Sequence, residues 1–118
     1  MSDQFNSFIS PINQDVVDQI EKLDLSTLQK LHLKLLSHCL EVFKDISLKA
    51  ETEFPNEILL KRWCDNEAKK LKDDSFSMLL FEQMNSAAIK LNNFSKKKGK
   101  HALDLNLDDL INLISFEN

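Results

Sequence analysis

Apolar residues recur at intervals of three and four positions along most of the chain, which is the period of an amphipathic helix. Four segments show this period, and we expect them to form the four main helices: residues 11–23, 25–50, 55–72 and 76–98. The segment 25–50 has the widest apolar face. Because so wide a face contacts neighbours on more than one side, we expect 25–50 to be the central helix.

Residues that favour helix ends stand at these boundaries. Ser10 and Pro11 suit a helix start, because serine caps free backbone amides and proline at the first helical position has no amide to leave unpaired. Ser26 followed by Gln29 is a capping-box pattern, and the alternative is a cap at Asp24 with Leu23 packed on Leu28. Gly99 suits the left-handed residue that follows a helix. Further capping residues precede the fourth helix: Asp73, Asp74 and Ser75.

The C-terminal tail first alternates and then becomes helical. Leu103, Leu105 and Leu107 alternate with polar residues, and Asn106 then suits the cap of a short helix. We therefore predict an all-α protein with a single domain over residues 1–118. Its expected architecture is a compact antiparallel helical bundle of four main helices plus a short C-terminal helix, since short connections favour antiparallel neighbours.

The predicted core contains the apolar residues that share the inward faces of these helices. They are Leu28, Leu35, Cys39, Phe43, Ile46, Leu60, Trp63, Leu71, Phe76, Leu80, Met84, Leu91 and Phe94.

The composition supports an all-α fold and excludes several kinds of site. The chain of 118 residues has one glycine, two prolines and no tyrosine. Leucine is its most frequent apolar residue, and leucine favours helices, whereas the β-branched residues that favour strands are rarer. With a single glycine, the glycine-dependent turns of hairpins, dinucleotide-binding folds and P-loops are excluded.

The sequence shows no segment directed to a membrane. No apolar run approaches the ~20 residues needed to span a bilayer. Residues 1–10 lack a basic region followed by an apolar stretch, as a secretory signal would have. We expect a cytoplasmic protein that does not associate with membranes, in which Cys39 and Cys64 are small buried residues.

No motif in the sequence predicts catalysis, a metal or a cofactor. His32 and His38 are six positions apart, so on one helix they cannot share an ion. Cys39 follows His38 directly, which places the two side chains on different faces of a helix. We expect a protein that is not an enzyme, with no catalytic residues, no bound metal and no cofactor.

Charge is distributed unevenly along the chain. Acidic residues dominate residues 1–26 and 101–118, whereas most lysines lie between these segments. One interpretation is that the acidic ends pack on the basic middle and neutralise it. The other is that the ends form part of a docking surface for a partner.

A lysine-rich turn near the end of the fourth helix is a candidate nucleic-acid site, because clustered cations bind phosphates without reading sequence. Its residues are Lys96, Lys97, Lys98, Lys100 and His101. Two observations oppose this role: the net charge is -4, and Arg62 is the single arginine, so bidentate recognition of guanine is nearly excluded. The lysines equally complement the negative end of a helix dipole.

The tail also resembles acidic, leucine-spaced peptide motifs that dock in grooves of partner proteins, including the Leu-x-Leu-x-Leu repression motif of plant regulators. The candidate partner-binding residues are Leu103, Leu105, Leu107, Asp108, Asp109, Leu110 and Ile114. A last helix that closes the bundle explains the same leucines without a partner.

We expect a small non-enzymatic interaction module, an adaptor, regulator or inhibitor that binds another protein. Its apolar faces are wide for so small a bundle, and self-association as a homodimer is one way to cover them. The alternative is a weak, sequence-tolerant nucleic-acid-binding protein that uses the lysine-rich turn 96–101.

Overall fold

A computed structural model describes residues 14–117, and within this range the protein is all-α, as predicted. The expected helix start at Ser10 and Pro11 lies outside the described residues. The helices are α2 (Gln14–Glu21), α3 (Thr27–Ala50), α4 (Glu57–Leu71), α5 (Asp74–Lys98) and α6 (Leu107–Glu117), with a short 3-10 helix η1 (Ala102–Asp104) before α6. No strand occurs between residues 14 and 117.

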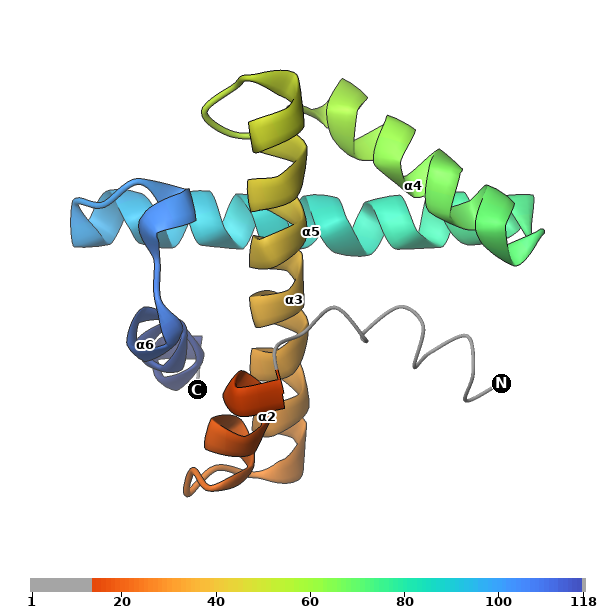
Figure 1. Ribbon diagram of the computed structural model, residues 1–118. Helices are drawn as coiled ribbons and strands as arrows, with labels where there is room; N and C mark the ends of the chain where they lie inside the picture. The colour runs from red at the N-terminus through yellow and green to blue at the C-terminus, as the bar shows by residue number, and fades with distance from the viewer. Residues whose placement is uncertain (1–13, 118) are drawn as a thin grey trace.

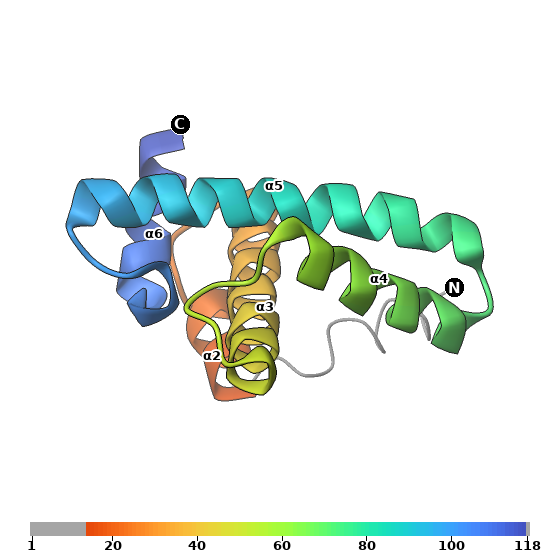
Figure 2. The ribbon, with the colours of Figure 1, turned by 90° about the horizontal axis from the view of Figure 1, so that it is seen from above.

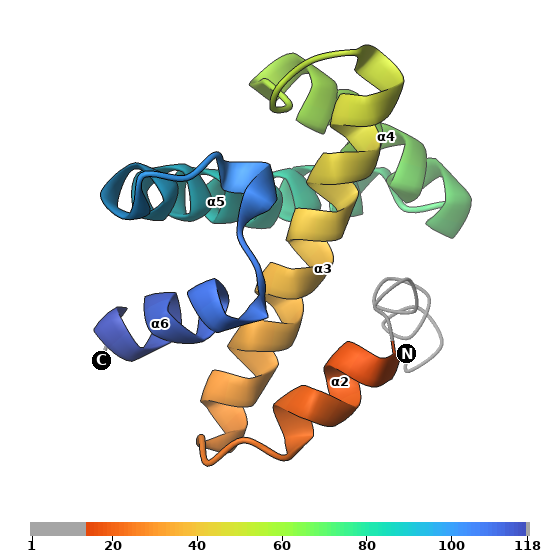
Figure 3. The same ribbon diagram turned by 60° about the vertical axis from the view of Figure 1, so that its left-hand side comes forward.

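The bundle is built around the crossing of its two longest helices. α3 lies across α5 at a steep angle (Figure 1). α4 runs beside α5 in the opposite direction, and the contact between them is the most extensive of any two elements (Figures 1 and 2). The antiparallel arrangement is therefore clearest in this pair. α2 and α6 lie against α3, below its crossing with α5 in Figure 3.

Local capping determines where the helices begin and end. The Oγ of Ser26 accepts a hydrogen bond from the Gln29 amide, and the Ser26 amide donates to the Gln29 side chain, which confirms the predicted capping box. The third predicted helix begins two residues late, at Glu57, because the Asn56 side chain caps it. Gly99 has the predicted left-handed conformation, with φ 69°.

The core confirms most of the predicted inward positions. Eight of the predicted residues are buried: Cys39, Phe43, Ile46, Leu60, Leu80, Met84, Leu91 and Phe94. Four others are only partly buried: Leu35, Trp63, Leu71 and Phe76. Phe43 is fully buried, and its ring lies 5.3 Å from that of Phe54 between centroids.

The prediction that Leu28 belongs to the core is wrong, since its side chain is 75 % exposed. α5 does not cross α3 at the N-terminal end of α3, so the first turns of α3 project beyond the crossing (Figures 1 and 3). On those turns the side chain that packs inward is Leu33, which is fully buried. The apolar face of α3 is wide, and α2 and α6 both pack on α3, so the helical period alone does not determine which part of that face is buried.

The two thiols are free and buried, as predicted for small core residues. The Sγ of Cys39 donates a hydrogen bond to the sulfur of Met84 at 3.4 Å, so this thiol lies at the contact between α3 and α5. Over residues 14–117, no helix combines the length and apolar character needed to cross a bilayer.

Candidate functional site

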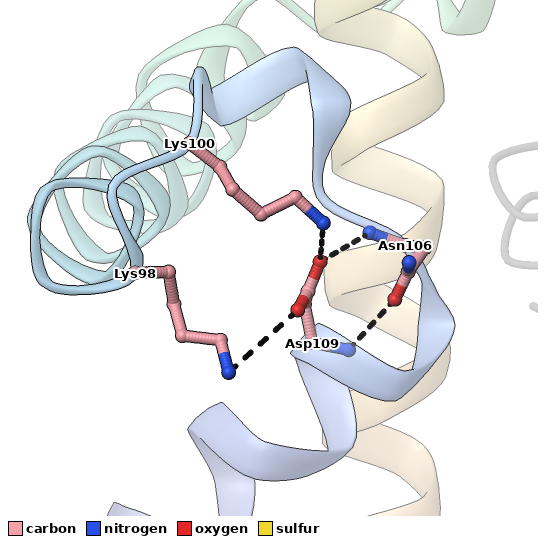
Figure 4. A network of polar contacts seen from close by, with 4 residues as sticks. All are labelled: Lys98, Lys100, Asn106 and Asp109. Carbon is pink, nitrogen blue, oxygen red and sulfur yellow. Dashed lines mark hydrogen bonds and ion pairs between the residues drawn. The ribbon is translucent and has the colours of Figure 1, made fainter.

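The junction between α5 and α6 brings the two predicted sites together. It consists of the last turn of α5, the turn at Gly99, the 3-10 helix and the first turn of α6. Lysines of the candidate nucleic-acid site come from α5 and the turn, and Asp109 of the candidate partner site comes from α6 (Figure 4). The two sets are therefore neighbours, and their charges are opposite.

Asp109 is the centre of a polar network at this junction (Figure 4). Its carboxylate accepts a hydrogen bond from Lys100 Nζ at 2.6 Å and another from the Asn106 amide at 3.0 Å. Lys98 Nζ lies 4.0 Å from the second carboxylate oxygen. The Asn106 side chain in turn accepts from the Asp109 amide at 2.9 Å, so the two residues cap the first turn of α6 reciprocally.

Asp109 is only 6 % exposed, and its hydrogen-bond partners and the neighbouring lysines stabilise the charged carboxylate against the cost of burying it. The hydrogen bond from Lys100, followed by the one from the Asn106 amide, lowers the pKa of the carboxyl group below its usual value. The network therefore links the turn after α5 to the first turn of α6 through hydrogen bonds and ion pairs.

The network leaves only part of the lysine-rich turn available to bind an anion. Lys98 and Lys100 pair with Asp109, and Lys98 also lies 5.9 Å from the centre of the Phe94 ring. His101 accepts a hydrogen bond from the Leu103 amide through Nδ1 and thereby caps the 3-10 helix. Lys96 and Lys97 are exposed on the last turn of α5, where they complement the helix dipole.

The leucines of the candidate docking motif face the interior to different degrees. Leu105, Leu110 and Ile114 are buried, Leu103 and Leu107 are partly buried, and Asp108 is exposed. α6 packs directly on α3. These leucines therefore complete the core, and docking through them would require α6 to leave α3.

The acidic N-terminal segment also contacts the basic middle of the chain. Glu21 at the end of α2 forms an ion pair with Lys34 of α3, and the Lys30 ammonium group donates a hydrogen bond to the Glu21 carbonyl at 2.8 Å. The Lys34 pairing lowers the pKa of the Glu21 carboxyl group. Together with Asp109, this pair neutralises part of the basic middle from within the chain.

A second surface, which the sequence analysis missed, lies between α4 and α5. There the two helices border an open groove of about 480 Å³, lined by Glu57, Ile58, Lys61, Arg62, Asp65 and Phe81. Ile58 is 69 % exposed, and Phe81 is partly buried. The signal in the sequence was that Ile58 lies outside the α4 stripe of Leu60, Cys64 and Ala68, although it is large and apolar.

The buried thiols are poorly suited to nucleophilic chemistry. Burial raises the pKa of Cys39 to about 12 and that of Cys64 to about 11, which disfavours the reactive thiolate. Among the described residues, no group of three or more His, Cys, Asp and Glu side chains is arranged to hold a metal ion.

Comparison with curated proteins and with solved structures gave no match. A family model described as "NDH complex assembly factor CRR9" matches residues 12–117. The match extends over all the helices described above, from α2 to α6. The chain therefore belongs to the CRR9 family of NDH complex assembly factors.

Proposed function

We propose that this protein is a non-enzymatic assembly factor that binds protein components of an NDH complex while the complex is being built. The observation that carries the proposal is the family match over residues 12–117. An assembly factor acts by binding, and this agrees with the interaction module expected from the sequence. We also propose that it acts in the cytoplasm.

The surface offers apolar contacts to a protein partner outside the α5–α6 junction. Large apolar side chains are exposed on three helices: Leu28, Leu31 and Leu48 on α3, Ile58 on α4, and Met78, Leu79 and Ile89 on α5. Two pairs lie close together in sequence on one helix, Leu28 with Leu31 and Met78 with Leu79, and grouped exposed apolar residues are characteristic of interaction sites. Because α6 is held by the core and by Asp109, we assign partner binding to these exposed helix faces.

The test is to remove the gene from its source organism and to measure the assembled NDH complex by native gel electrophoresis. We expect the complex to decrease and to recover when the wild-type chain is restored. A tagged chain should copurify at least one NDH subunit. An unchanged amount of complex, together with no copurifying NDH subunit, would refute the proposed function.

Surface variants refine this test without disturbing the core. Leu28→Asp with Leu31→Asp removes the exposed apolar pair on α3, and Met78→Asp with Leu79→Asp removes the pair on α5. Thr27→Asp, an exposed polar position beside the first pair, is the control. We expect at least one double variant to fold normally yet fail to restore assembly, whereas the control restores it.

A further inference from the structure

The polar residues of the α4–α5 groove divide into a satisfied group and an unpaired group. Lys61 Nζ donates to Asp65 at 3.0 Å and to Ser77 Oγ at 3.2 Å, and Ser77 Oγ also donates to Asp65. Glu57 and Arg62 line the same groove. Neither of these two side chains forms an ion pair or hydrogen bond with another residue in the described range 14–117.

The unpaired charges have opposite signs and lie on either side of an exposed apolar residue. Glu57 is the first residue of α4, Ile58 follows it, and Arg62 lies just over one turn further along the same helix. Consider a twofold axis that meets α4 midway between Glu57 and Arg62. It places each Glu57 opposite the Arg62 of a second copy, and each Ile58 opposite the methylene groups of that copy's Lys61.

Such an arrangement is complementary to itself. A twofold interface uses the same surface patch on both subunits, so every residue pair across it occurs twice. Here the symmetry brings unlike charges together and keeps like charges apart. Ile58 and the half-buried Phe81 supply apolar area beside the charged pairs.

We propose that the α4–α5 groove is a twofold interface between two copies of this chain, with Glu57 of each copy paired to Arg62 of the other. The interface goes beyond the assembly function, because it requires no NDH component. Apolar burial at Ile58 and Phe81 favours association, and the two symmetric ion pairs fix the orientation of the copies.

Charge reversal tests this pairing in the purified full-length chain. Glu57→Arg places like charges across the axis twice, and so does Arg62→Glu; we expect each to weaken dimerisation by about tenfold or more. The double variant Glu57→Arg/Arg62→Glu recreates both pairs in reversed orientation. It should restore the dissociation constant to within about threefold of the wild-type value.

Two further variants separate the groove from general effects of charge and folding. Lys69→Glu makes the same charge change as Arg62→Glu on an exposed position of α4 outside the groove, and it should leave dimerisation unchanged. Ile58→Asp should abolish the dimer. Because Ile58 is 69 % exposed, the folded monomer should keep its helical circular dichroism and its Tm.

Sedimentation equilibrium from about 1 to 200 μM gives the dissociation constants, with circular dichroism of each variant as the check on folding. A dimer that both single reversals weaken and the double reversal restores supports the proposal. A wild-type chain that is monomeric throughout this range overturns it and leaves the groove to a segment of another protein. The proposal is also overturned if the single reversals leave the dissociation constant unchanged, or if the double variant stays monomeric.

Discussion

Replacing Asp109 with alanine tests whether the polar network holds the tail in place. The substitution removes the charged acceptor of the Lys100 hydrogen bond, a class of interaction that contributes about 1.5–3 kcal/mol. It also removes the acceptor of the Asn106 amide, which contributes about 0.5–1.5 kcal/mol. The freed lysines regain water, and alanine favours the helix by about 0.5 kcal/mol, which offsets part of the loss. We expect a net destabilisation of about 2–3 kcal/mol.

Urea denaturation followed by circular dichroism measures this change, and the Tm should fall by roughly 10 °C. Asp108→Ala is the matched control, because it removes the same charge from the neighbouring position of the first turn of α6, where the side chain is exposed. Its expected cost is below about 0.5 kcal/mol. Unfolding free energies of the two variants that agree within about 0.5 kcal/mol would refute the account of the network.

The pH dependence gives the same argument a second test. The pKa of Asp109 is lower in the folded protein than in the unfolded chain, where a carboxyl group titrates near about 3.9. Its contribution to stability is therefore fully present above that value and is lost as the pH falls through the folded pKa. The difference in stability between wild type and Asp109→Ala should be constant from about pH 5 to 7 and should shrink below about pH 4.

Three further outcomes follow from burial and backbone geometry. Phe43→Ala should lower the unfolding free energy by about 3–5 kcal/mol because the ring is fully buried. Leu28→Ala, at a largely exposed position, should change it by less than about 1 kcal/mol. Urea denaturation measures both variants, and equal costs would contradict this assignment of the core. Gly99→Ala should cost about 1 kcal/mol, since φ is 69° and a Cβ there meets no atom within 4 Å; a Tm equal to that of wild type would contradict this. The unfolded thiols ionise near about pH 8.5, whereas Cys39 and Cys64 keep their protons in the fold, so stability should fall as the pH rises above about 9. A Cys39→Ala/Cys64→Ala variant with the same fall in stability would show that other groups cause it.

Local signals in the sequence were sufficient to place α3, α4 and α5 to within two residues. The cap at Ser26 and the left-handed Gly99 depend on residues close to them in the chain, so both were predicted correctly. The burial of Leu28 depends on where another helix crosses α3. The helical period identifies the apolar face of a helix, but it does not show which turns of that face a neighbouring helix covers.

In the candidate site, too, the sequence predicted what depends on nearby residues and missed what depends on contacts between distant segments. The sequence identified the lysines of the turn and the acid Asp109, but in two competing hypotheses, because their contact requires α6 to fold back past the end of α5. The groove at Ile58 requires α4 and α5 to lie side by side. No single helical stripe contains both of its walls, so its residues could not be grouped from spacing alone.

The return of α6 to α3 has a consequence for the order of folding. α4 and α5 are joined by Lys72 and Asp73 alone, so their contacts form between segments that are close in the chain. α6 reaches α3 only after α4 and α5 have intervened, and closing this larger loop costs more chain entropy. We expect the α4–α5 hairpin to form early and α6 to dock last. In native-state hydrogen exchange, the amides of α6 should then open as a separate unit while the hairpin remains protected.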